Sequence, residues 1–229
     1  GSFAGASGHD MTPTDCPDDH EPDPLTGGAQ PLDAAAADAV DRVYHLYDPP
    51  LWLVTAAEDA RAGSLRGGCI ATFVARASIV RARPRMVAGI ARQHHTWRMI
   101  ETSGRFCVHL LPRGALDLVW RLALSSGRET DKFESLPDDR TPAGSPLVAD
   151  ALAWLDCRVE TSMNTGDRTV YLAAVTGGGT LQPDAGAPMT VGDLMQGAPP
   201  EKRAELDRLY ARDGQIDTEA MRHWRSNRA

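Results

Sequence analysis

The sequence has few of the features that mark membrane, secreted or metal-binding proteins. No run of roughly 18 or more apolar residues occurs, and the first thirty residues lack the basic start and apolar stretch of a signal peptide. We therefore expect a cytoplasmic protein. The four cysteines are scattered without C-x-x-C pairing, which argues against a disulfide framework. Three of them lie inside apolar runs and are expected to be buried thiols. The 229 residues, 42% of them hydrophobic, suffice for one sizeable core.

Basic residues are missing from the first 41 positions, which hold nine acids. This segment therefore accounts for the formal charge of −7, and the rest of the chain carries +2 from 24 bases and 22 acids. A near-neutral remainder argues against the basic stripe of a nucleic-acid-binding protein. Residues 1–31 are acidic and poor in apolar side chains, so we expect a disordered tail whose first ten residues are an expression remnant.

The common cofactor and catalytic motifs are also missing. The sequence contains no G-x-G-x-x-G opening a helix, no P-loop, no H-E-x-x-H and no Ser-His-Asp order. Gly177-Gly-Gly179 is interpreted as a flexible turn, and His94-His95 alone cannot form a zinc site, so no metal is predicted. An enzyme without these motifs needs a bound cofactor to supply its reactivity.

The apolar periodicity predicts a mainly β fold with helices. Short strands of uneven length alternate with single helices, and this order fits an antiparallel barrel better than a βαβ series. We expect a barrel domain over residues 32–179 and a helical extension over 180–229. The predicted strands cover 51–55, 67–78, 85–90, 105–111, 151–163 and 169–175. The first predicted helix begins at residue 33 and stops at Pro49-Pro50, and the others cover 96–103, 116–125, 201–212 and 218–228.

Five segments in order resemble the flavin reductase-like family, between about Tyr44 and Gly178. They are Leu51-Trp-Leu-Val-Thr55, GGCIATFVARASIV, RPRMVAGIARQHHTWRMIETSGRFCVHLL, SPLVADALAWLDCRVE and GDRTVYLAAV. Each motif is weak alone, but five at suitable spacing identify the fold. The resemblance implies a homodimeric, FMN-binding split β-barrel with peripheral and C-terminal helices, with the flavin near the subunit interface.

The resemblance also implies which residues bind the cofactor. The strand after Gly67-Gly68 and the loop that follows it run along the flavin in the family, and the polar turn before the helix at Thr96 provides phosphate donors. Two serines of the family motif are replaced here by Ala71-Thr72. The matched positions are Ala71, Thr72, Phe73, Val74, Ala75, Arg76, Ala77 and Ser78, followed by Gln93, His94, His95 and Thr96.

Each candidate also has a purely structural interpretation. Thr96 precedes a helix, where N–H groups attract anions, yet it could equally act as a helix cap. Phe73 and Val74 could belong to the core. Gly166-Asp167 suits a hairpin turn as well as a cofactor contact.

Arg168 is the expected catalytic position, because the family often carries His there. An arginine can contact dinucleotide phosphates but cannot act as a general acid near neutral pH. Hydride transfer needs ring stacking and exclusion of water rather than a protein acid.

Two functions of different class remain open. The resemblance favours an NAD(P)H-dependent flavin reductase that uses FMN, with FAD as an alternative, and supplies a partner monooxygenase. The replacement of His by Arg168 keeps open an FMN-holding electron-transfer or flavin-storage protein without nicotinamide turnover. A split barrel recruited to oxidise or reduce a substrate of its own is a third interpretation.

Overall fold

The computed structural model describes residues 31–124, 132–134 and 136–227. The predicted tail therefore lies outside the described residues, except for Pro31. The elements in chain order are α1 (Ala34–Tyr44), β1 (Trp52–Ala57), β2 (Arg66–Ala71), β3 (Val74–Arg76), β4 (Arg85–Ala91), α2 (His95–Ser103), β5 (Arg105–Leu110), α3 (Leu116–Leu124), β6 (Ala153–Asn164), β7 (Arg168–Thr180), α4 (Val191–Gly197) and α5 (Pro200–Ser226).

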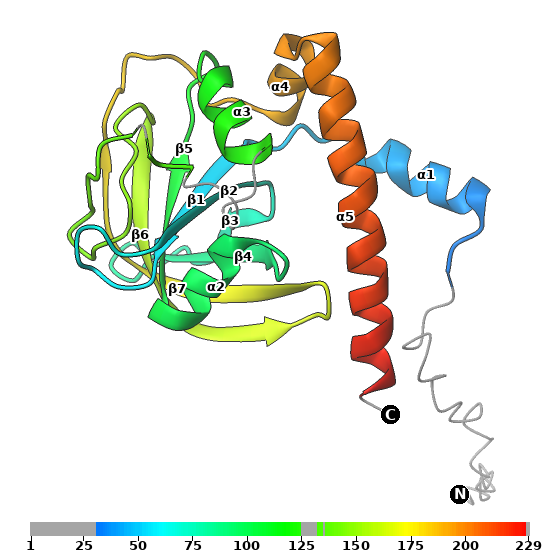
Figure 1. Cartoon of the computed structure of the whole chain (residues 1–229), viewed down its shortest axis with the longest axis horizontal. Coiled ribbons are helices and arrows are strands. Elements are labelled where there is room, and N and C mark those ends of the chain that lie inside the picture. Colours follow the sequence, from blue (N-terminus) through cyan, green and yellow to red (C-terminus); the bar gives the residue numbers. More distant parts are fainter. Residues whose placement is uncertain (1–30, 125–131, 135, 228–229) are drawn as a thin grey trace, which may run out of the picture.

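The described strands form one curled antiparallel sheet in the order β2-β1-β5-β6-β7-β4-β3. Alternate residues of β1 enter two core clusters, as the period of a strand requires. Val54 and Ala56 face a cluster that includes Met99 and Ile100 of α2, whereas Leu53 faces a cluster under α3 and α4. In Figure 1, α2 lies at one end of the sheet and α3 and α4 lie at the other.

The predicted strand over 67–78 is divided in two, which corrects the sequence-based expectation. Ala71 is the last residue of β2 and pairs with Trp52, whereas Val74 begins β3 and pairs with Ala88 of β4. Thr72 and Phe73 therefore carry the chain from one edge of the sheet to the other. The strand has to bend there because β2 and β3 are the two edges of the curl.

The interpretation of Gly177-Gly-Gly179 as a flexible turn is wrong, because all three residues lie within β7 and pair with β6. The Trp154 side chain lies against this stretch: a Cβ added at Gly179 would come 3.1 Å from its Nε1, and one at Gly178 would come 2.6 Å from Leu155 Cδ2. Glycine is used here to admit large neighbours rather than to provide flexibility.

The C-terminal segment forms one helix, α5, rather than the two that the sequence predicts. Gly214 lies between the two predicted helices, but an exposed glycine inside a helix costs only about 1 kcal/mol. The short helix α4 was not predicted, although Thr190 and Asp193 form a capping box at its start. In Figure 1, α5 runs beside the barrel towards the β6–β7 hairpin, and α1 projects from the body.

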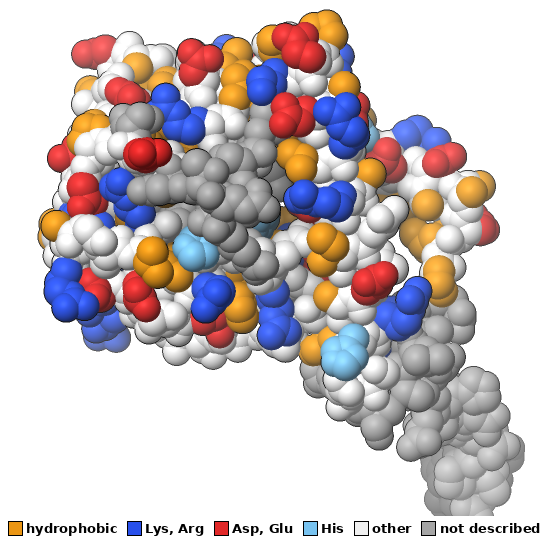
Figure 2. Space-filling model, in the orientation of Figure 1, with side chains coloured by type: hydrophobic (Ala, Val, Ile, Leu, Met, Phe, Trp, Pro, Cys, Tyr) orange, Lys and Arg blue, Asp and Glu red, His pale blue; other side chains and the backbone are white. Residues whose placement is uncertain are grey.

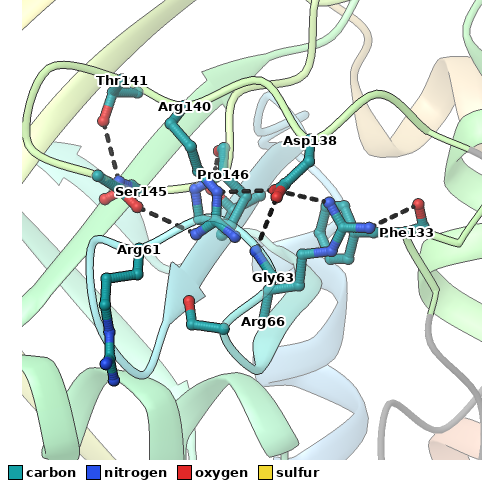
Figure 3. Close-up of polar contacts among 12 residues, drawn as sticks. Arg61, Gly63, Arg66, Phe133, Asp138, Arg140, Thr141, Ser145 and Pro146 are labelled. Atoms are coloured by element: carbon teal, nitrogen blue, oxygen red, sulfur yellow. Dashed lines mark hydrogen bonds and ion pairs between the residues drawn. The ribbon is translucent and has the colours of Figure 1, made fainter.

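A polar network holds the segment 133–146 against the β1–β2 turn (Figure 3). The Asp138 carboxylate accepts hydrogen bonds from the Gly63 N–H at 3.0 Å, Arg66 Nη1 at 3.0 Å and Arg140 Nε at 2.7 Å. The bonds from Arg140 and Gly63 hold the pKa of Asp138 below its usual value.

Acidic and basic side chains of the described residues intermingle over the face shown in Figure 2, and no large patch of one sign appears among them there.

Candidate functional site

The three candidate segments meet at the end of β4. The Gly89 N–H donates to the Phe73 carbonyl at 2.8 Å, which ties the first segment to this strand. The Arg92 N–H donates to the Asp167 carbonyl at 3.0 Å, which ties the β4–α2 turn to the β6–β7 hairpin. Residues that lie up to about a hundred positions apart in the sequence are therefore held in one place by β4.

The first segment reaches this place only at its start. Phe73 is exposed beside Gly89, and a Cβ added at that glycine would come 3.3 Å from Phe73 Cβ. Val74 is buried, whereas the other β3 residues, Ala75 and Arg76, are exposed.

Ala77 and Ser78 lie at the opposite end of β4. The Ala77 N–H donates to the Arg85 carbonyl at 2.8 Å, and Ser78 Oγ accepts the Val80 N–H at 3.1 Å. The seven residues of β4 span about 20 Å in an extended strand. The predicted flavin contact at Ser78 is therefore separate from the phosphate donors predicted at the β4–α2 turn.

The second segment forms the turn into α2. His94 is the N-cap and Thr96 is the second helical residue, only 1% exposed. A Cβ added at Gly67 of β2 would come 3.0 Å from Thr96 Cα and 3.2 Å from Thr96 Oγ1. The Thr96 side chain therefore faces β2. Gln93 is half-buried, and among the described residues its Oε1 has no hydrogen-bond partner.

The third segment is the tight turn that the sequence predicts between β6 and β7. Gly166 has φ +95°, a left-handed conformation that favours glycine. Its N–H donates to Asn164 Oδ1 at 2.8 Å. Burial alone would raise the pKa of Asp167, but hydrogen bonds from Arg168 and Thr165 hold that pKa below its usual value.

Arg168 is held on several sides. Its Nε donates to Asp167 Oδ2 at 2.6 Å, and its Nη2 donates to Asp217 Oδ2 of α5 at 2.9 Å. Its guanidinium carbon lies 4.7 Å from the centre of the Phe73 ring. Sequence reasoning missed Asp217, because nothing in a charged, solvated helix marks one carboxylate as the partner of a hairpin arginine.

Two other polar side chains that lie inside predicted strands, those of Cys157 and His109, belong to the core. Cys157 is buried, and burial raises the pKa of its thiol to about 12. His109 is buried in a position where Nε2 accepts the Val148 N–H at 3.3 Å and Nδ1 lies 3.3 Å from the Leu53 carbonyl. Burial lowers the His109 pKa to about 4, so this side chain is neutral near pH 7.

Metal and membrane sites were sought over the described residues. No group of three or more His, Cys, Asp or Glu side chains there is arranged to hold a metal ion. Within the same residues, no helix combines the length and the apolar character needed to span a bilayer.

The curled antiparallel sheet with helices at its ends is a split barrel, and it occurs in known flavin-binding proteins. One is the Streptomyces globisporus NADH:FAD oxidoreductase SgcE6, with a TM-score of 0.57 and 21% identity over 71% of this chain and 90% of that one. Another is an FMN-binding protein from Thermus thermophilus, with a TM-score of 0.53 and 24% identity over 60% and 74% of the two chains. These likenesses confirm the predicted fold.

Residues 44–194 match the flavin reductase like domain, and the chain belongs to that family. A flavin reductase from Pseudomonas putida is 29% identical over 114 residues, 49% of this chain and 63% of the relative. The monooxygenase reductase subunit HsaB of Mycobacterium tuberculosis H37Rv is 36% identical over 80 residues, 35% of this chain and 41% of the relative. The chain thus matches less than two thirds of the length of these relatives.

The residues at the end of β4 suit a flavin. Within the part of the chain that the structure describes, Gln93 Oε1 is a buried acceptor without a partner, and flavins carry N–H and O–H donors. The first turn of α2 offers backbone N–H groups and a helix dipole to a phosphate. Phe73 offers an exposed aromatic face at the same place.

Proposed function

We propose that this protein is an NAD(P)H-dependent flavin reductase that uses FMN, with FAD as the alternative flavin. The observation that supports this most is the convergence of the three candidate segments on β4 through the Gly89–Phe73 and Arg92–Asp167 hydrogen bonds. The names of the P. putida and S. globisporus proteins support the same activity. The likeness to HsaB supports delivery of reduced flavin to a partner monooxygenase.

A bound flavin would supply the redox chemistry, the acceptance of a hydride from the nicotinamide. The chain's own residues have to bind, orient and shield. We assign the phosphate end to the side-chain N–H groups of Gln93, His94 and His95 and to the Thr96 backbone. Gln93 Oε1 would accept from a ribityl hydroxyl, and we assign the ring to the segment that starts at Ala71-Thr72. Gly166, Asp167 and Arg168 border the nicotinamide side, where Arg168 orients the dinucleotide and donates no proton.

The test is to mix purified protein with FMN and NADH or NADPH and to follow the loss of nicotinamide absorbance. Steady oxidation that depends on both flavin and protein is the expected result. The rate of nicotinamide oxidation should be compared with that of the Gln93→Leu variant, which removes the buried Oε1 acceptor. A protein that binds FMN without oxidising either nucleotide would contradict the proposal.

One observation favours a second candidate, the flavin-holding protein without nicotinamide turnover. Arg168 is engaged by two carboxylates, so part of its capacity to hold a dinucleotide phosphate is already taken. The same experiment distinguishes the two functions, because the second candidate binds FMN but leaves the nicotinamide absorbance unchanged.

We also propose that the chain forms a homodimer. The apolar face of α1 and the residues after it, Val43, Tyr44 and Tyr47, are 61%, 71% and 68% exposed. A cluster of this kind on a projecting helix is typical of an interface. Light scattering should give twice the mass of the chain, and replacement of Val43, Tyr44 and Tyr47 by Ser should halve it.

A further inference from the structure

The position of α5 on the β6–β7 hairpin is fixed by two independent contacts. The first is the ion pair between Asp217 of α5 and Arg168, whose side chains are only 18% and 23% exposed. The second is steric: a Cβ added at Gly166 would come 2.9 Å from Trp224 Cβ and 3.0 Å from Met221 Cα. The helix therefore lies directly against the turn that carries Arg168.

Charge at this contact is unbalanced. Asp167 and Asp217 place two carboxylates on one guanidinium, and Asp213 lies close enough to raise the Asp217 pKa further. Burial is the main cause of that raised pKa, and Arg168 opposes it. An anion that approaches Arg168 is thus repelled by the carboxylates around it. It also finds the guanidinium already hydrogen-bonded to Asp167 and Asp217.

We propose that Asp217 limits the affinity for the nicotinamide dinucleotide, because it competes with the dinucleotide for Arg168. This inference rests on the proposed function. The Nη2 edge that Asp217 occupies is a phosphate-binding edge of arginine, so a dinucleotide pyrophosphate has to displace Asp217 to use it. The free energy needed to separate Asp217 from Arg168 reduces the free energy of dinucleotide binding by the same amount. The position of α5 therefore sets the affinity for the dinucleotide.

The geometry also says which ligand should feel the competition. The predicted flavin phosphate donors lie at the β4–α2 turn, which contacts the hairpin through the Arg92–Asp167 backbone hydrogen bond and through Arg92 Nη1, 3.5 Å from Asn164 Oδ1. The ion pair lies on the α5 side of the hairpin. Competition should therefore affect the dinucleotide and leave the flavin unaffected.

The experiment is to measure binding of inorganic pyrophosphate and NAD+ to the full chain by calorimetry, without divalent cations. Asp217→Asn removes the competing charge with little change in shape and should bind both probes about five- to tenfold more tightly, equivalent to about 1–1.4 kcal/mol. Asp217→Glu keeps the charge and should bind them like the unmodified protein. Asp213→Asn is the matched control. It also removes one carboxylate, but Asp213 lies one helical turn before Asp217 and is paired with Arg212 rather than with Arg168.

Each outcome has a definite meaning. The gain in Asp217→Asn should disappear in the double variant with Arg168→Gln, because the competition acts through that arginine. Unchanged or weaker binding by Asp217→Asn, or an equal gain in Asp213→Asn, would overturn the proposal. A gain for FMN over riboflavin with no gain for NAD+ would also overturn it, because the anion would then be the flavin phosphate.

Failure of the proposed function would look different. In that case no variant would oxidise NADH or NADPH in the presence of FMN, whatever the pyrophosphate affinities. If both proposals hold, Asp217→Asn should lower KM for the nicotinamide nucleotide and leave the flavin dissociation constant unchanged.

Discussion

The guanidinium carbon of Arg168 lies 4.7 Å from the centre of the Phe73 ring, so the hairpin and the bend between β2 and β3 share one cation–π contact. Arg92 makes a similar contact with Trp97 at 5.1 Å, but the Arg92 side chain is exposed. The two arginines form a natural pair for comparison, because they differ mainly in burial and in their ion pairs.

Arg168→Lys should destabilise the protein more than Arg92→Lys. A lysine cannot stack flat on Phe73 while it bonds Asp167 and Asp217, so we expect a loss of about 1–2 kcal/mol. The exposed Arg92 should cost less than about 0.5 kcal/mol. Urea unfolding followed by circular dichroism measures both changes. Equal losses would mean that the partly buried ion pairs contribute nothing.

Gly166→Ala should detach α5 from the hairpin. The new methyl group would come 2.9 Å from Trp224 Cβ, and the φ of +95° is unfavourable for alanine as well. Gly63→Ala is the control, because Gly63 has φ +74° but nothing within 4 Å. Strain at Gly63 alone should cost about 1 kcal/mol, and Gly166→Ala should exceed this and expose α5 to protease. Similar stability and similar proteolysis of both variants would contradict the packing.

Stability should fall as the pH is lowered from 6.5 towards 4, because of His109. The unfolded chain takes up a proton with a pKa of 6.5, whereas the folded protein resists protonation down to about 4. The stabilisation is therefore complete above pH 6.5 and is lost as the pH falls, by up to roughly 3 kcal/mol. His109→Gln retains a donor and an acceptor, so its stability should vary less across this range. Thermal unfolding of both proteins from pH 7 to pH 4 measures this. If His109→Gln lost stability with falling pH as steeply as the unmodified protein, another group would be responsible.

Thr96→Ala and His95→Ala should affect flavins differently. Because the Thr96 hydroxyl is buried against Gly67 of β2, its loss should lower stability and weaken FMN and riboflavin to the same extent. If His95 contacts the phosphate as proposed, its loss should weaken FMN about tenfold and riboflavin little. Fluorescence quenching by each flavin measures the four affinities. Selective loss of FMN in Thr96→Ala would return the phosphate contact to that hydroxyl.

The sequence predicts most elements because the signals for them are local. Asp33 caps α1 by accepting a hydrogen bond from the Ala36 N–H, and Gly104 directly after the predicted helix 96–103 ends α2 with φ +67°. The family was recognised for the same reason, since its motifs are short and follow one another in order. The orientation of the Thr96 hydroxyl was beyond such signals, because Gly67 and Cys69 approach it from another strand.

The break at Thr72 and Phe73 and the continuity of α5 depend on tertiary structure. An apolar run gives no sign that its two halves pair with opposite edges of a sheet. A glycine such as Gly214 normally weakens a helix, and only the contact of the distal half with the hairpin shows why the helix continues. The Arg168–Asp217 pair joins two segments 49 positions apart and has no counterpart in the local pattern.

Trp154 lies against the glycines of β7, and Trp224 lies against Gly166 on the hairpin. Each indole is thus a built-in optical reporter of a different event. Separation of β6 from β7 would hydrate Trp154, whereas departure of α5 would hydrate Trp224 while the barrel stays intact. In variants whose single remaining tryptophan is one of these two, out of the five in the chain, emission spectra should separate melting of the sheet from release of the helix.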